Sequence, residues 1–234
     1  MAEEGSSGER GSTALALVFP PAEAIRANRA LRARRPGIGE PSPALGDAEV
    51  SHWRSLLEGS PTLGTVVDQI YEEAVRRTSV AATAAHQSVA TAAIVTSVLV
   101  LTIALPAVGQ MFEVSPWFLI AVAFAFVGLL SAARAARLAR FAAVDLDVIG
   151  DPIESGRAAR GEAARDVFLV AVRARRAAAA AHNRVVSEAV TNLVTAAWGC
   201  LRNAFVALLA WILIDVAPAA FAAGARGLGR TFGA

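Results

Sequence analysis

Two long uncharged stretches in the middle of the chain constrain its fold more than any other feature. Residues 78–112 carry no formal charge over 35 positions, and residues 114–133 are uncharged over 20 more. The apolar part of the first stretch, 89–108, would make a helix of about 30 Å at 1.5 Å per residue, which matches the hydrocarbon thickness of a bilayer. Glu113 is the only charge in the loop between them. Together the two stretches predict a two-span helical hairpin over 89–133.

A third apolar segment lies near the C-terminus. Residues 203–222 are mostly apolar but are interrupted by Asp215 and Pro218. In this frame Arg202 lies at the inner edge, where a long side chain reaches the headgroups, and Asp215 is an intramembrane charge. A carboxylate inside the hydrocarbon is costly, so it would face other helices or water. The alternatives are an interfacial Asp215 that ends the helix early, and a frame of 189–214 that places Arg202 near mid-membrane.

Composition supports a membrane protein and argues against several other classes. The chain is 55% hydrophobic and only 18% charged, whereas about a quarter of the residues of a soluble domain are charged. Its 22 basic residues are all arginine, and its net charge of +2 does not indicate binding to a nucleic-acid polymer. A single cysteine, Cys200, excludes both an intramolecular disulfide and a cysteine-rich zinc module.

The distribution of arginine predicts the orientation of the spans. The segment before the hairpin holds nine arginines, the segment 134–202 holds 11, and the hairpin loop holds none. Because loops rich in Arg stay on the cytoplasmic side, the N-terminus and the 134–202 connector are predicted to be cytoplasmic. The expected location is the cell (inner or plasma) membrane, with a multi-pass topology.

The predicted fold class is therefore an all-α integral membrane protein, with a two-span hairpin, a long cytoplasmic helical connector and a third C-terminal span. Pro61 is expected to start a helix that runs directly into the first span. Small residues along the spans favour a homo-oligomer, because they let helices approach closely. The expected segments are a disordered Pro/Gly/Arg-rich N-terminus (1–47, with a short basic helix over 22–35), a cytoplasmic helix (48–88), the hairpin (89–133), an Arg-rich helical connector (134–202), the third span (203–222) and a short tail (223–234).

Catalytic motifs are missing from the sequence. It has no GxxxxGK[ST] phosphate loop and no HExxH zinc motif, and its three histidines are far apart. The acidic segment 145–156 places Asp145, Asp147 and Gly150 at positions 1, 3 and 6 of a calcium loop, but Gly156 occupies the position where a bidentate Glu is required. We therefore predict a non-enzymatic protein with no cofactor and no metal site.

The hairpin (89–133) and the connector with its span (165–214) together resemble small membrane effectors of bacterial antiphage defence. Two groups share this layout: the SLATT-type effectors and the transmembrane effectors of Pycsar systems. The resemblance implies that a partner enzyme makes a cyclic nucleotide, that the cytoplasmic part of the effector binds it, and that an oligomer of spans then impairs membrane integrity. Guanidinium groups match phosphate, so the implied ligand residues are Arg173, Arg175 and Arg176.

A second hypothesis belongs to another class. A non-catalytic membrane scaffold, such as a subunit of an actinobacterial plasmid-transfer or secretion locus, needs only spans, a basic cytoplasmic face and a partner. A transporter subunit is a weaker option, because Asp215 would be its only intramembrane charge and three spans are few for alternating access. Toxicity separates the first two hypotheses, since a triggered effector harms its host and a scaffold does not.

Overall fold

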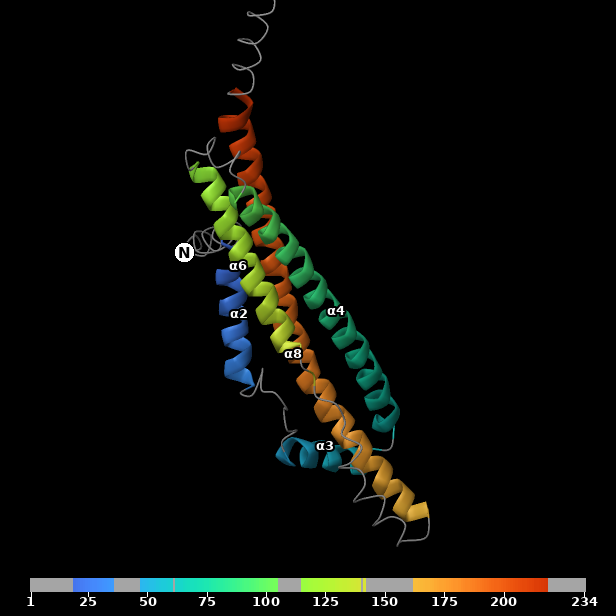
Figure 1. The fold of residues 1–234 in the computed structure, drawn as a ribbon. Coiled ribbons are helices and arrows are strands. Elements are labelled where there is room, and N and C mark those ends of the chain that lie inside the picture. Colours follow the sequence, from blue (N-terminus) through green and yellow to red (C-terminus); the bar gives the residue numbers. More distant parts are fainter. Residues whose placement is uncertain are drawn as a thin grey trace, which may run out of the picture. The chain divides into compact units, whose positions relative to one another are not determined.

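The computed structural model describes residues 19–35, 47–60, 62–104, 115–139, 141 and 162–218. Every regular element in these ranges is a helix (Figure 1). The elements are α2 (Pro20–Arg34), α3 (Asp47–Gly59), α4 (Leu63–Ala104), α6 (Pro116–Leu138), α8 (Glu162–Trp211) and a five-residue π-helix, η1 (Ile212–Val216), which continues α8.

Three of these helices, α4, α6 and α8, are long and apolar enough to cross a membrane. The prediction of an all-α integral membrane protein with three candidate spans is therefore confirmed. Both α4, with 42 residues, and α8, with 50, are longer than the roughly 20 residues that a bilayer requires. The charges of α4 all lie in its N-terminal half, and those of α8 lie in its N-terminal part except for Arg202, so each helix provides both a polar segment and a candidate span.

Within the N-terminal region, the short basic helix expected over 22–35 is present as α2 (Pro20–Arg34). It buries Ala24, Asn28 and Leu31 along one face. Their spacing of four and three residues is that of one helical stripe, and burial of this stripe outweighs the low hydrophobicity of the segment. The remaining expectations for residues 1–13, the linker 36–46, the acidic segment 145–156 and the tail 223–234 concern residues outside those that the structure describes.

The expected helix over 48–88 is two helices. The chain turns after α3, where the N–H of Leu63 donates to the carbonyl of Ser60 at 3.1 Å. From there α4 runs without a break to Ala104, so the helix continues into the first span as expected, although it begins at Leu63 and not at Pro61.

The chain forms two compact units. The span unit comprises residues 1–26, 86–134 and 193–234, and the polar unit comprises residues 27–85 and 135–192.

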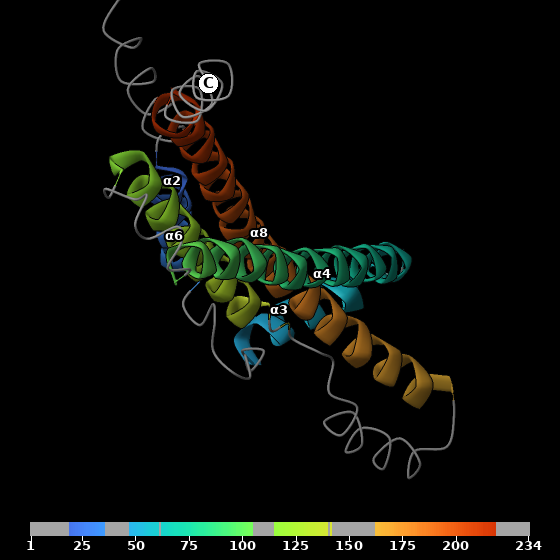
Figure 2. The ribbon, with the colours of Figure 1, turned by 45° about the horizontal axis from the view of Figure 1, so that its top comes forward.

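In the span unit, small side chains let three helices pack closely. Ala92 of α4, Ala132 of α6 and Ala197 of α8 belong to one buried cluster, and Leu99, Phe118 and Ala204 belong to a second. A Cβ at Gly128 would lie 3.3 Å from the carbonyl oxygen of Ala197, so glycine lets α6 approach the α8 backbone. Figure 1 shows the corresponding segments of α4, α6 and α8 running in roughly the same direction, and the view of Figure 2 shows α4 crossing the other two.

The polar unit is built around its segment of α8. Four consecutive alanines, from Ala177 to Ala180, are each at most 5% exposed, and Val186 and Val190 are fully buried. A helix can bury consecutive residues only when neighbours cover it on several sides, and short side chains allow those neighbours to come close. α3 covers one side through Leu57 and Trp53, which pack with Ala174 and Ala177.

Candidate functional site

The arginines predicted to bind a ligand lie on α8 within the polar unit. Arg173 and Arg176 are three residues apart, so they lie on one side of the helix. Arg175 lies between them and is half-buried. In the structure Arg173 and Arg176 share one partner, a residue that the sequence pattern did not indicate.

That partner is Asp68 of α4. The Nε of Arg173 donates to one carboxylate oxygen of Asp68 at 3.1 Å, and Nη1 of Arg176 donates to the other at 2.8 Å. The Asp68 side chain is 29% exposed, and those of Arg173 and Arg176 are 29% and 40% exposed. One carboxylate therefore holds two guanidinium groups in a partly solvated position, an arrangement that we call the Asp68 clamp.

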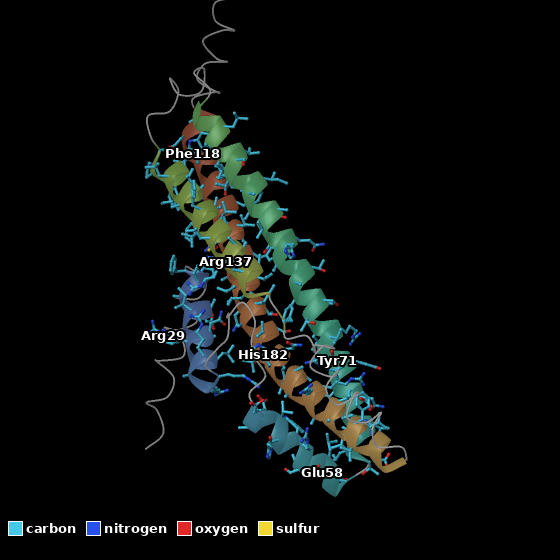
Figure 3. All side chains as sticks on the ribbon, turned by 60° about the horizontal axis from the view of Figure 1, so that its bottom comes forward. Arg29, Glu58, Tyr71, Phe118, Arg137 and His182 are labelled. Atoms are coloured by element: carbon cyan, nitrogen blue, oxygen red, sulfur yellow. The ribbon has the colours of Figure 1, made fainter. Side chains whose placement is uncertain are left out.

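Two further residues of α4 shape the clamp. The guanidinium carbon of Arg176 lies 5.5 Å from the centroid of the Tyr71 ring, within the range of a cation–π contact. Gly64 lies one turn before Asp68, and a Cβ there would come within 2.7 Å of Cζ of Arg173. Glycine at this position leaves the space that the Arg173 guanidinium occupies. Figure 3 shows Tyr71 on α4 in the polar unit.

The two guanidinium groups of the clamp are suited to binding an anion. Two half-exposed guanidinium groups on one helix face present several N–H donors to a planar or tetrahedral anion. In the structure Asp68 accepts one N–H from each of the two guanidinium groups. An anion carrying two or more oxygens, such as a phosphate, could take the place of the carboxylate with the same donors, and this exchange would release α4 from α8.

A buried polar layer lies further along the same segment of α8. Nδ2 of Asn28 donates to the carbonyl of Ala189 at 3.0 Å, and Nδ2 of Asn192 donates to Oδ1 of Asn28 at 3.0 Å. These bonds attach α2 to α8. His182 is only 6% exposed, and its Nε2 has no hydrogen-bond partner among the described residues. Burial lowers the pKa of His182, and the nearby Arg35 lowers it further, while Glu49 acts in the opposite direction.

Asp215 lies in the span unit, within η1. The N–H of Ala217 donates to the carbonyl of Ile212, five residues earlier, which is the hydrogen bond of a π turn. A π turn inserts one residue into the helix and is often found at functional positions. Asp215 is exposed and accepts a hydrogen bond from the hydroxyl of Ser115, the residue before α6.

An aromatic pair lies one turn from this contact. The rings of Phe118 and Trp211 meet edge to face with centroids 5.3 Å apart. This pair and the Ser115–Asp215 bond fasten the start of α6 to the end of α8. Asp215 therefore lies level with the first turn of the second span.

The remaining candidate chemistry is sparse. Within the described ranges, no group of three His, Cys, Asp or Glu side chains is placed to hold a metal ion. Cys200 is fully buried against the hairpin, next to Gly128. No sequence signal could have identified Asp68 as a site residue, because it is separated from Arg173 by 105 positions and sits in an ordinary helical segment.

No protein-family model, curated protein or solved structure matches the chain.

Proposed function

We propose that the protein is a membrane effector of a bacterial antiphage defence system. In this proposal, a cyclic nucleotide made by a partner enzyme binds the polar unit through Arg173, Arg175 and Arg176. The bound state shifts the spans of a homo-oligomer so that the inner membrane loses its integrity. The polar unit faces the cytoplasm, in agreement with the excess of arginine on either side of the hairpin.

The Asp68 clamp is the observation that carries this proposal. A cyclic nucleotide offers a phosphodiester with two free oxygens, the same acceptor pattern that the Asp68 carboxylate offers to Arg173 and Arg176. A ligand that competes with Asp68 binds the unclamped state and not the clamped one. Such differential affinity is what a ligand needs in order to shift a conformational equilibrium.

The continuity of the helices supports coupling to the membrane. Asp68 lies on α4, and Arg173 and Arg176 lie on α8, and each helix contains a candidate span further along. Release of Asp68 frees two helices that both continue as membrane segments.

A membrane-integrity assay tests the proposal. The full chain is expressed in cells together with cyclases that make single cyclic nucleotides, including cyclic UMP and cyclic CMP, and propidium iodide uptake is followed. We expect uptake to depend on one nucleotide. The double variant Arg173→Ala with Arg176→Ala should abolish the dependence.

The control is Arg184→Ala, which removes one exposed arginine from the same helix away from the clamp. It should retain the wild-type response. If no nucleotide causes uptake despite confirmed membrane insertion, the effector proposal is rejected and the scaffold hypothesis takes its place. If the double variant responds like the wild type, the nucleotide binds elsewhere.

A further inference from the structure

The exposed side of α2 carries four arginines. Arg26, Arg29, Arg32 and Arg34 are all exposed, and none of them forms an ion pair or a hydrogen bond with another side chain in the described part of the chain. Glu23 is the one acidic residue of this helix, so the helix has an excess of positive charge. The face opposite the arginines is the one that packs on α8, which leaves a basic surface for an acidic partner.

The N-terminal end of α2 lies at the level of the apolar part of the spans. Within the span unit, Pro20 lies against Gly199 of α8, where a Cβ would come within 2.6 Å of Cγ of the proline. The same part of α8 faces Gly128 of α6, whose own Cβ would lie 3.3 Å from the carbonyl oxygen of Ala197. Gly128 precedes Arg134, where the uncharged run of α6 ends, by six residues, or about 9 Å along the helix. Pro20 therefore lies well inside the boundary that Arg134 marks.

After Pro20, α2 runs towards the polar end of α8. In the polar unit, Asn28 is hydrogen-bonded to a segment of α8 that precedes Gly199, so the two helices run in opposite directions. Arg26 is six residues after Pro20, or about 9 Å along the helix. This distance returns Arg26 to the level of Arg134, where the spans leave the apolar layer and lipid headgroups begin.

Apolar side chains at the N-terminal end of α2 fit the same position. Phe19 is 41% exposed and Ile25 is 46% exposed, and both precede the first arginine of the helix. Trp198, the neighbour of Gly199 on α8, is 47% exposed. Exposed aromatic and apolar side chains followed by arginines are typical of the boundary between acyl chains and headgroups. The segment is thus apolar beside the spans and basic directly beyond them.

We propose that α2 is a lipid-binding helix, in which Phe19 and Ile25 contact the acyl chains of the adjacent leaflet and Arg26 and Arg29 bind the phosphates of anionic lipids. Guanidinium groups donate several N–H bonds to phosphate oxygens. Arg29 is about 4.5 Å beyond Arg26 along the helix, well within the Debye length of about 10 Å at 0.1 M salt. The partner is a lipid because the basic surface begins where the spans leave the apolar layer. This inference does not rest on the proposed function, since it requires neither a nucleotide nor the Asp68 clamp.

Quenching of Trp198 by brominated lipids tests the proposal. The full chain carries Trp53→Phe, Trp117→Phe and Trp211→Phe, which leaves Trp198 as its only tryptophan. It is reconstituted in equimolar phosphatidylglycerol and phosphatidylcholine, with bromine on the acyl chains of only one of the two lipids. Comparison of the two quenching values gives the relative affinity of the two lipids for the surface beside Trp198 and the N-terminal end of α2.

We expect a preference for phosphatidylglycerol on the order of tenfold, because each arginine near the headgroups contributes about fivefold. Arg26→Gln with Arg29→Gln should lower this preference about fivefold or more. Raising the salt to 1 M should also lower it, since the Debye length is then about 3 Å. The matched control is Arg54→Gln with Arg184→Gln, which removes the same charge from exposed positions on α3 and α8 and should keep the preference.

A second measurement uses the chain with all four of its tryptophans. A ligand that binds only the folded state raises the melting temperature. Phosphatidylglycerol added to detergent micelles should therefore raise the melting temperature of the wild type more than phosphatidylcholine does. The control with Arg54→Gln and Arg184→Gln should show the same difference, and the variant with Arg26→Gln and Arg29→Gln should lose it.

Three results would overturn the proposal. Equal quenching by the two brominated lipids in the wild type would show that this surface does not select anionic lipid. An unchanged preference after Arg26→Gln with Arg29→Gln would assign the lipid to other arginines, such as Arg134. An equal loss in the control would show that net charge alone attracts the lipid. None of these results bears on nucleotide-dependent dye uptake in cells, which is measured separately.

Discussion

The burial of His182 makes the stability of the polar unit depend on pH. Its Nε2 and the hydroxyl of Ser187 are both buried without a hydrogen-bond partner among the described residues. A neutral imidazole tolerates such a site better than an imidazolium, because burying an unpaired charge is far more costly. The facing charged groups are Arg35, which disfavours the cation, and Glu49, which favours it.

We therefore predict that acid destabilises the polar unit through His182. Because the pKa of His182 in the folded chain is below its ordinary value of 6.5, the unfolded chain binds more protons between the two values. This contribution to stability is complete above pH 6.5 and decreases as the pH falls towards the folded pKa. Melting temperatures in detergent should fall between pH 7 and pH 5.

The variant His182→Gln is the control for this titration. It keeps a polar side chain of similar size but cannot be protonated, so its melting temperature should fall less over the same range. If both proteins lose the same amount, other groups cause the acid sensitivity. His182 lies outside both frames considered for the third span, 189–214 and 203–222, so the detergent environment affects both proteins equally.

At the scale of elements, α2 is held on α8 more by specific polar contacts than by hydrophobicity. Asn28 both donates to Ala189 and accepts from Asn192. At its other end, α2 brings Pro20 against Gly199, where a Cβ would come within 2.6 Å of Cγ of the proline. Sequence periodicity could suggest a basic helix here, but it could not show that the helix is docked.

Asn28→Ala should loosen this attachment. The change removes two hydrogen bonds and leaves the half-buried amide of Asn192 without its acceptor, which costs about 1–3 kcal/mol of stability. We expect a lower denaturation midpoint in detergent and faster trypsin cleavage after the arginines of α2. Arg29→Ala, at an exposed position on the same helix (Figure 3), should leave the midpoint unchanged; an equal loss in both variants would contradict the assigned role of Asn28.

At the scale of the whole molecule, the clamp and the spans share two helices. α4 and α8 each contain a charged segment and a candidate span, so a contact made between the charged segments involves two of the three membrane helices. A protein that must respond to a ligand and act on a bilayer can do both with this layout. A static scaffold has no need of a half-exposed clamp.

Under the proposed function, Asp68→Asn should sensitise the effector. Loss of a partly exposed carboxylate that pairs with two arginines weakens the clamped state by roughly 1–2 kcal/mol, which lowers the nucleotide concentration for half-maximal dye uptake about tenfold. Glu73→Gln is the matched control, since it removes one charge from α4 whose partners, Arg76 and Arg77, lie on the same helix. A response of Asp68→Asn equal to that of the control would show that the clamp does not hold the resting state.

The amino-acid sequence by itself was sufficient for the helical class and the number of candidate spans. These features depend on local quantities, namely the length of uncharged runs and the placement of charges, which lipid and water act on directly. The ligand role of Arg173 and Arg176 came from the resemblance and stays a prediction. The docking of α2 onto α8 could not be predicted, because the composition of this segment is that of a solvated basic segment.

Only the tertiary structure decided which residues meet. Asp68 is 105 positions from Arg173, and Ser115 is 100 positions from Asp215, and no periodicity connects them. The same limit applied to the register of the third span, where composition left two frames open. The cluster shared by Ala132 and Ala197 and the hydrogen bond from Ser115 to Asp215 set the register of α8 beside α6. Register is a property of helices packed together, and a hydropathy pattern along one helix does not contain it.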